Sequence, residues 1–252
     1  MPKQLSLDNT SFDQPRFDRP LTTVDIVVFA LFADALHVLV VKRKDLPGEP
    51  YPNGWALPGG FIDTVRDISL EACAQRKLLE KTAINHAYIE QLGGWGNQTR
   101  DPRGWSSTHS FFALLSSDHL ANLRCGGNAA ELKWIKVTGK LKEPLAFDHA
   151  LIVEAAVERL RGKVEYTSLP AFLIAREFTL SELQRAFEIV LDRKLEKSAF
   201  RTRVLSIDLV AEVPRFREGA NRPAQLYKLQ SAKRSVFFQR TFKPNSDYLG
   251  VD

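Results

Sequence analysis

Apolar and polar positions alternate along the first two thirds of the chain in patterns typical of strands and amphipathic helices. Two β-branched apolar runs, LTTVDIVVFALF (21–32) and HVLVVKRK (37–44), are separated by a short break at Asp34 and Ala35, which predicts a hairpin. SLEACAQRKLLEKT (69–82) has helical spacing, with Ser69 as its N-cap. The remaining expected elements are the strands 87–93, 109–115 and 132–137 and the helix 146–162. Strands mixed with two helices predict a layered α/β domain.

The pattern changes after Gly162. A capping box from Thr179 to Glu182 opens an amphipathic helix, and a more basic helix follows it. Two short apolar runs then flank the turn FREGANRP, which predicts a β-hairpin. These expected elements are the helices 177–195 and 197–207 and the strands 209–215 and 224–229. Helix, helix and hairpin are the order of a winged helix-turn-helix.

Four segments follow from these patterns. They are a polar N-terminal segment predicted to be flexible (1–20), an α/β domain (21–162), a winged helix domain (163–230) and a C-terminal tail of ambiguous pattern (231–252).

The positive charge of the chain lies in its last third. The net charge is +5, residues 1–170 are neutral, and residues 171–252 carry the whole excess. A basic terminal module suits a polyanionic partner such as DNA, although a solvated basic face is the alternative interpretation.

Composition indicates a location in the cytoplasm. Apolar residues make up 44% of the chain, but no run approaches the roughly 18 uninterrupted apolar residues that a membrane helix needs. The polar start is not a secretory signal, so no membrane partner is expected. The two cysteines, Cys73 and Cys125, lack metal-site spacing and fit a reducing compartment.

Residues 55–84, WALPGGFIDTVRDISLEACAQRKLLEKTAI, resemble the Nudix box, a motif of glycine, glutamate, arginine and a glutamate pair. Gly60 matches the glycine, Arg76 the arginine and Glu80 the first glutamate of the pair. The resemblance implies an α/β (α+β) Nudix-type sandwich that binds a nucleotide diphosphate.

The sequence also departs from the box. Lys77 and Lys81 stand where two glutamates belong, Ala83 replaces a glycine, and two extra residues lengthen the loop before Arg76. Mg²⁺-dependent hydrolysis needs several carboxylates on one helix face, and two lysines there oppose a cation. We therefore expect no catalytic residues and no required cofactor, with Mg²⁺ relevant only to residual hydrolysis. The residual metal-ligand candidates are Asp67, Glu71 and Glu80.

The segment GGWGNQTRDPRGWSSTHSFF (93–112) resembles the stretch that follows the box in ADP-ribose-type Nudix proteins. Its arginines match phosphate bidentately, and its tryptophans either stack on an adenine or pack in the core. LAFDHA (145–150) resembles a helix start near the substrate in these relatives, although a lone histidine is often structural. The helix after the Gly-Gly loop favours anions. The predicted ligand-binding residues are Arg43, Gly59, Gly60, Glu80, Trp95, Arg100, Arg103, Trp105, Asp148 and His149.

The second helix of the basic module has the pattern of a recognition helix. Ser198, Arg201 and Thr202 share one face, while Phe200 and Val204 lie on a face that would pack inward. A polar face of this kind suits the DNA major groove, and the arginine-rich hairpin turn suits phosphates or the minor groove. The predicted DNA-binding residues are Lys197, Ser198, Arg201, Thr202, Arg203, Arg215, Arg217 and Arg222.

A Nudix-like domain joined to a winged helix resembles the Nudix-related transcriptional regulators of NAD metabolism, the NrtR family. Shared phrases include GGFID, RKLLEKTA, RDPRGWS, PLAFDH and GANRPAQLY. The resemblance implies a homodimeric repressor of NAD biosynthesis or salvage genes, released from a palindromic operator by ADP-ribose.

Two other interpretations remain at this point. One is an ADP-ribose pyrophosphatase with an unusual Nudix box, dependent on Mg²⁺, with an accessory C-terminal domain. The other is a nucleotide-binding adaptor whose basic module binds another protein.

Overall fold

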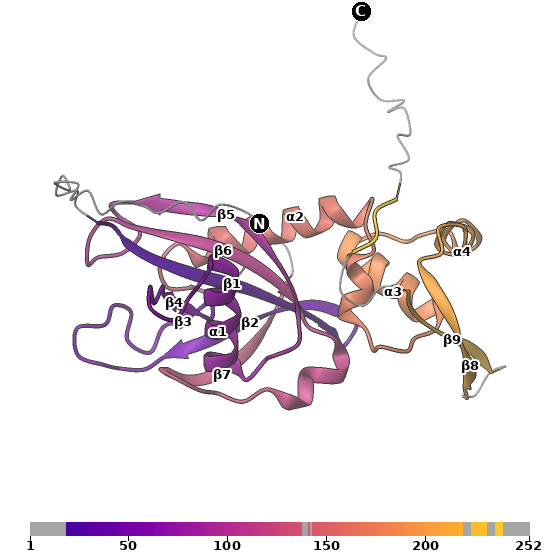
Figure 1. The fold of residues 1–252 in the computed structure, drawn as a ribbon, viewed down its shortest axis with the longest axis horizontal. Coiled ribbons are helices and arrows are strands. Elements are labelled where there is room, and N and C mark those ends of the chain that lie inside the picture. The colour runs from indigo at the N-terminus through magenta and orange to yellow at the C-terminus, as the bar shows by residue number, and fades with distance from the viewer. Residues whose placement is uncertain (1–18, 138–140, 142, 219–222, 231–234, 239–252) are drawn as a thin grey trace, which may run out of the picture.

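The computed structural model of this 252-residue chain describes residues 19–137, 141, 143–218, 223–230 and 235–238. One seven-stranded sheet contains β1 (Leu21–Phe32), β2 (Ala35–Arg43), β3 (Trp55–Ala56), β4 (Gly59–Phe61), β5 (Tyr88–Asn97), β6 (Ser106–Leu114) and β7 (Ala129–Lys136). The helical elements beside this sheet are α1 (Leu70–Thr82), the 3-10 turn η1 (Ser117–Asn122) and α2 (His149–Val164). The C-terminal unit contains the 3-10 turn η2 (Leu169–Leu173), α3 (Leu180–Leu191), α4 (Lys197–Ser206), β8 (Val210–Arg217) and β9 (Ala224–Leu229). The two units lie at opposite ends of an elongated molecule (Figure 1).

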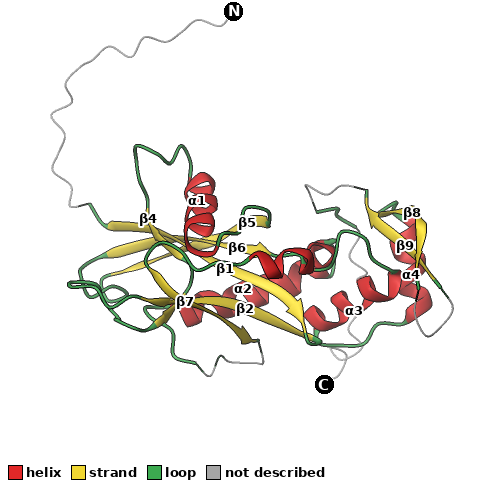
Figure 2. Ribbon diagram, turned by 90° about the horizontal axis from the view of Figure 1, so that it is seen from below, coloured by secondary structure: helices red, strands yellow, loops and turns green. Residues whose placement is uncertain are grey.

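Strand β1 is the centre of the sheet and is covered on both faces. Its side chains alternate between two apolar clusters: Val24, Ile26 and Val28 pack with α1, whereas Val27 and Phe29 pack with α2. Because both faces of such a strand are buried, its sequence is a nearly continuous apolar run. Figure 2 shows α1 and α2 on opposite sides of the sheet.

The sheet is mixed. β1 pairs in parallel with β6 and antiparallel with β2, and the path through the sheet is β3-β2-β1-β6-β5. β4 adds to β1 and β7 adds to β2. The predicted hairpin is confirmed, and its turn is formed by Ala33 and Asp34, both with positive φ.

The predicted box helix is confirmed as α1. Ser69 caps it by accepting a hydrogen bond from the backbone N–H of Ala72. The helix ends at Ala83, whose φ of 60° places it in the left-handed region that favours glycine. The substitution of the box glycine by alanine therefore falls at a strained C-cap.

The winged helix order of helix, helix and hairpin is also confirmed. Thr179 and Glu182 form the expected reciprocal capping box at the start of α3. The backbone of Phe178 pairs with Tyr227, which attaches the start of α3 to strand β9. Helix α3 is shorter than the predicted helix 177–195, because Thr179 caps its start and Asp192, with a left-handed φ of 55°, ends it.

The two units share one hydrophobic core. A single apolar cluster includes Ile152 and Leu160 of α2 and Leu183 and Val190 of α3. The boundary expected after Gly162 falls inside α2, which continues to Val164. The structure thus connects the units through a packed helix rather than through an extended linker.

In the part of the chain that the structure describes, we find no helix with the length and hydropathy of a membrane span.

Candidate nucleotide pocket and nucleic-acid interface

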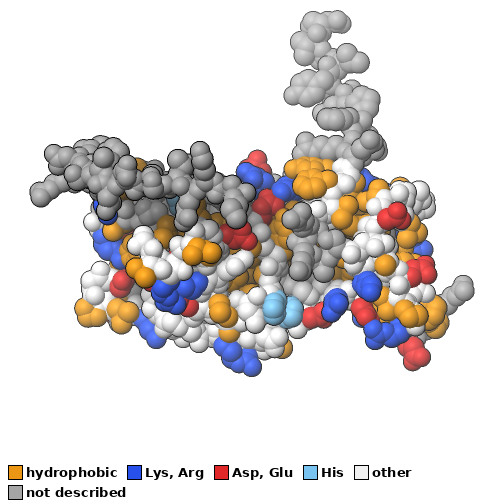
Figure 3. Space-filling view, viewed as in Figure 1, with side chains coloured by type: hydrophobic (Ala, Val, Ile, Leu, Met, Phe, Trp, Pro, Cys, Tyr) orange, Lys and Arg blue, Asp and Glu red, His pale blue; other side chains and the backbone are white. Residues whose placement is uncertain are grey.

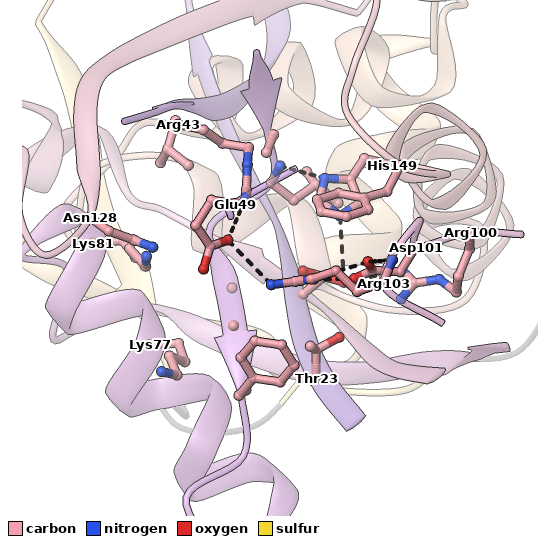
Figure 4. A pocket seen from close by; sticks show the side chains of 18 residues that line it. Thr23, Arg43, Glu49, Lys77, Lys81, Arg100, Asp101, Arg103, Asn128 and His149 are labelled. Atoms are coloured by element: carbon pink, nitrogen blue, oxygen red, sulfur yellow. Dashed lines mark hydrogen bonds and ion pairs between the residues drawn. The ribbon is translucent and has the colours of Figure 1, made fainter. Parts of the chain in front are cut away.

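A cleft lies where β1, the end of β2, α1, the β5–β6 loop and the start of α2 meet (Figure 4). Its charged lining side chains are the five cations Arg43, Lys77, Lys81, Arg100 and Arg103 and the three acids Asp25, Glu49 and Asp101. The surplus of positive charge suits an anionic ligand such as a phosphate.

Two adjacent glycines form part of the cleft wall, as predicted for Gly59 and Gly60. A Cβ on Gly59 would lie 2.3 Å from both the Asp25 carboxylate and the Val24 carbonyl oxygen. Only glycine therefore lets β4 pair closely with β1. Gly60 has a φ of +148°, a conformation that other residues rarely adopt.

The two lysines that replace box glutamates both face this cleft. Lys77 and Lys81 are separated by one turn of α1, so their side chains emerge on the same side. Burial, together with the charges of Lys77 and Arg43, lowers the pKa of Lys81 to about 8. From the sequence these lysines are expected only to remove metal ligands, whereas the structure places both in the lining of the cleft.

Arg100 is bound within the protein. Its Nε and Nη2 donate to the two carboxylate oxygens of Asp148 at 2.9 and 2.8 Å, and Asp25 lies 3.6 Å away. The side chain of Arg100 is only 3% exposed. Arg100 and Asp148, both predicted to contact the ligand, thus satisfy each other in this structure and fix the start of α2 beside the cleft.

His149 is held from both sides of its ring. Its Nδ1 accepts a hydrogen bond from the backbone N–H of Leu57 at 2.9 Å, and its Nε2 lies 3.6 Å from the Asp25 carboxylate. Burial acts to raise the pKa of Asp25, but His149, Thr108 and Arg100 outweigh burial and hold it below its usual range. Sequence analysis missed Asp25, although a lone acid inside the apolar run 21–32 was a signal for it.

The predicted phosphate ligands Arg43 and Arg103 both reach the cleft. Arg103 donates to Asp101 through Nε at 3.0 Å and Nη2 at 2.8 Å. Glu49, which sequence analysis did not single out, accepts hydrogen bonds from both arginines. Nothing in the sequence marks Glu49, because it is one acid in the proline- and glycine-rich loop between Arg43 and Gly59.

The aromatic side chains of the cleft are not those predicted. Phe61 and Phe147 line it, and each ring stacks beneath a guanidinium group, of Arg103 and Arg43 respectively. Trp95 packs beside α2 in a different hollow, and Trp105 is half exposed outside the cleft. The positions of the two tryptophans therefore do not support the prediction that one of them stacks on an adenine.

The residual metal candidates Asp67, Glu71 and Glu80 pair with neighbouring side chains and do not converge on one position. Arg76 donates to both oxygens of Asp67, at 2.6 and 2.5 Å, and to Glu80 at 3.1 Å. Glu80 also lies near Arg66 and Lys77, and Glu71 pairs with a glutamine. Among the described residues, no three His, Cys, Asp or Glu side chains are placed to hold a metal ion together. Asp67, nine residues before Arg76, is the carboxylate that pairs bidentately with the box arginine.

Helix α4 presents the predicted faces. Phe200 and Val204 are buried, whereas Ser198, Arg201 and Thr202 are exposed. Lys197 is also exposed, at the first turn of the helix. This polar, basic face has the character of a recognition helix.

Arg203 departs from that face and points inward. Its Nη2 donates to the carbonyl oxygen of Glu165 at 3.2 Å, and its guanidinium lies 4.4 Å from the ring centroid of Phe238. Burial lowers the pKa of Arg203. In this structure the side chain ties α4 to the end of α2, and its contact with DNA stays a prediction.

The wing arginines are paired with acids near the start of α3. Arg215 binds Glu177, while Arg217 lies 3.2 Å from a Glu182 oxygen and donates to the Glu177 carbonyl oxygen. Figure 3 shows basic and acidic side chains next to each other at this end of the molecule. Arg222, the remaining predicted wing contact, lies outside the described residues.

Comparison with known proteins gives both units a family. The NUDIX domain family matches residues 21–156, and the NrtR DNA-binding winged helix domain matches residues 170–229. The ADPR responsive transcriptional repressor NtrR of Acinetobacter baylyi is 42% identical over 217 residues, 86% of this chain and 85% of that protein. The chain belongs to the NrtR family.

Solved structures of an NrtR protein are similar across both units. Shewanella oneidensis NrtR complexed with a 27mer DNA is 41% identical, with a TM-score of 0.74 over 83% of this chain and 93% of that one. The NUDIX domain of the same protein complexed with ADP ribose is 42% identical, with a TM-score of 0.53 over 60% and 94% of the two chains. The predicted Nudix fold with a C-terminal winged helix is thus confirmed for this NrtR family member.

Proposed function

We propose that this chain is a transcriptional repressor that binds operator DNA through its winged helix and leaves it when ADP-ribose fills the Nudix cleft. The genes repressed are those of NAD biosynthesis or salvage. The main support for the proposal is the placement of helix α2. This helix extends from the wall of the cationic cleft to the basic recognition helix α4.

The cleft supplies the donors that a diphosphate requires. Arg43, Arg103, Lys77 and Lys81 converge on it from three separate elements, and arginine and lysine are the usual ligands of phosphate oxygens. The ADP-ribose complex of a 42% identical NUDIX domain supports this ligand.

Binding without efficient cleavage follows from the state of the box carboxylates. Arg76 pairs with both Asp67 and Glu80, and Arg66 and Lys77 also lie near Glu80. The lysines that replace the other box glutamates repel a divalent cation. These contacts favour a sensor over the alternative of a Mg²⁺-dependent hydrolase. We expect incubation with ADP-ribose and Mg²⁺ to release little AMP.

Helix α2 provides a physical connection between ligand and DNA. Its first residue, His149, lines the cleft, and its 16 residues span about 24 Å. Near its other end, Arg161 donates to the Val190 carbonyl oxygen of α3, and the carbonyl oxygen of Glu165, its C-cap, accepts from Arg203 of α4. A shift of the helix at the cleft would therefore move both helices of the winged helix.

The proposal also requires that the protein binds DNA as a homodimer. Winged helix proteins that read palindromic operators place two recognition helices at a fixed half-site spacing. ADP-ribose must bind one dimer arrangement more tightly than the other, because a ligand with equal affinity for both shifts nothing.

The test is a mobility shift on DNA upstream of neighbouring NAD-metabolism genes, titrated with ADP-ribose. We expect a sequence-specific complex that weakens steeply with salt and dissolves as ADP-ribose is added. A complex that forms equally on unrelated DNA, or that ADP-ribose leaves unchanged, would contradict the proposal.

A further inference from the structure

The Glu49 carboxylate lies between two of the cationic groups that line the cleft. Its Oε2 accepts a hydrogen bond from Arg43 Nη2 at 2.8 Å and from Arg103 Nη1 at 3.3 Å. Figure 4 shows the glutamate in the cleft with both contacts marked. A carboxylate in this position makes the same charge-assisted contacts that a phosphate oxygen would make.

The two arginines have different second partners. Arg43 Nε donates to the Pro50 carbonyl oxygen at 2.8 Å, within the loop that carries Glu49. Arg103 is held by Asp101, which belongs to its own loop. Removal of the glutamate from the cleft would therefore leave Arg103 in place with its Asp101 partner, and Arg43 at the end of strand β2.

Glu49 belongs to a loop suited to movement. Residues 44–48 and 51–53 of the β2–β3 connection are exposed. Gly48, Tyr51 and Asn53 all have positive φ, a conformation that glycine and asparagine adopt readily but that is costly for tyrosine. The Tyr51 ring contacts Phe147 edge-on at 4.8 Å between centroids, directly before α2.

We propose that Glu49 is an internal competitor for the phosphate position of the cleft. The ADP-ribose diphosphate replaces the Glu49 carboxylate as the partner of Arg43 and Arg103. The β2–β3 loop, which carries Glu49, then moves outward. This inference rests on the proposed function, because it assumes that ADP-ribose binds in this cleft.

Competition of this kind sets a threshold for the ligand. The glutamate offers one negative charge to the two arginines, whereas a diphosphate offers two and reaches the lysines as well. The carboxylate thus lowers the affinity of the cleft for every anion. A ligand with a single negative charge offers the arginines no more charge than Glu49 does, so it displaces the glutamate poorly. The protein would respond to ADP-ribose only at the higher concentrations at which displacement is complete.

The test is the ADP-ribose dissociation constant of Glu49→Gln, measured by isothermal titration calorimetry on the full-length protein. Glutamine keeps the shape of the loop but removes the charge. Since the ligand would no longer have to displace two partly exposed ion pairs, we expect the variant to bind ADP-ribose about three- to tenfold more tightly. Glu131→Gln is the matched control: Glu131 pairs with Lys42 at 3.6 Å outside the cleft, so its removal leaves the affinity unchanged.

Two results would overturn the inference. Weaker binding by Glu49→Gln would mean that Glu49 contacts the ligand directly, and equal binding would mean that it does not compete. If neither the wild type nor the variant bound ADP-ribose, the proposed function itself would be contradicted. Wild-type binding with an unaltered Glu49→Gln affinity would leave the function intact and remove only the competitor.

Discussion

Lys81 combines burial with a surplus of positive charge, which makes it the residue most sensitive to an anionic ligand. Its pKa of about 8 lies below the usual lysine range because burial and the neighbouring charges of Lys77 and Arg43 disfavour the ammonium. A bound diphosphate would favour the charged form. The protonated lysine therefore predominates below pH 8, and the favourable contact is lost as the pH rises.

We expect the affinity for ADP-ribose to fall by about tenfold between pH 7 and pH 9.5, with Lys81 as the main cause. The diphosphate itself stays fully ionised over this range. Calorimetric titrations at several pH values would measure the change. Lys81→Arg, which keeps its charge, should show tight binding with a much flatter pH profile; an equally steep profile would assign the titration to another group.

The Ala83 C-cap gives a prediction about stability. Its left-handed conformation is unfavourable for alanine and neutral for glycine, so Ala83→Gly should stabilise the fold by about 0.5–1 kcal/mol. Thermal unfolding should show a rise in Tm of about 1–4 °C. Ala155→Gly in the middle of α2 is the control and should lower Tm; a loss of stability in both variants would contradict the cap assignment.

At the residue scale the sequence predicted the cationic contacts better than the aromatic ones. Arg43 is the last residue of β2, and the end of that strand is visible in the apolar pattern. Arg103 was predicted from the resemblance of the RDPRGW segment to ADP-ribose-type Nudix proteins. The orientation of Trp95 is not visible in that way. β5 changes register between Gln91 and Gly93, and an irregularity of this kind reverses which face the later residues occupy.

At the scale of elements, α4 separates two arginines that the sequence treated alike. Arg201 is exposed on the predicted recognition face, whereas Arg203 is half buried against Glu165 and Phe238. The periodicity placed Phe200 and Val204 inward correctly. It could not show that a segment near the C-terminus, residues 235–238, returns to pack beside Tyr166 and Ser168 and so surrounds Arg203.

We expect Arg201→Ala to weaken operator binding by about tenfold or more, with unchanged Tm and unchanged ADP-ribose affinity. Arg203→Ala should instead lower Tm, because it removes the contacts that join α4 to the end of α2. Fluorescence anisotropy on operator DNA and thermal unfolding would separate the two effects. Reversed roles, with Arg201→Ala unfolding the module, would show that the helix face is misassigned.

At the scale of the whole molecule, the two units are joined more tightly than the sequence indicated. The composition placed the basic excess in the last third and the pattern placed two units, but the boundary after Gly162 falls inside a helix. The common core is formed by apolar residues of α2 and of α3. In the sequence, the apolar residues of each helix predict only the core of that helix's own domain. A shared core allows a shift in one unit to be transmitted to the other.

This connection predicts that ADP-ribose and DNA oppose each other through one coupling free energy. Linkage requires that the factor by which ADP-ribose weakens DNA binding equals the factor by which DNA weakens ADP-ribose binding. Coupling between sites in proteins commonly amounts to about 1–3 kcal/mol, or about 5- to 150-fold in affinity.

The most direct measurement is a calorimetric titration of ADP-ribose into the full-length protein, with and without saturating operator DNA. We predict a higher ADP-ribose dissociation constant in the presence of the operator and no change with DNA of unrelated sequence. An ADP-ribose affinity that is the same in both titrations would contradict the account, because the cleft and the winged helix would then act independently.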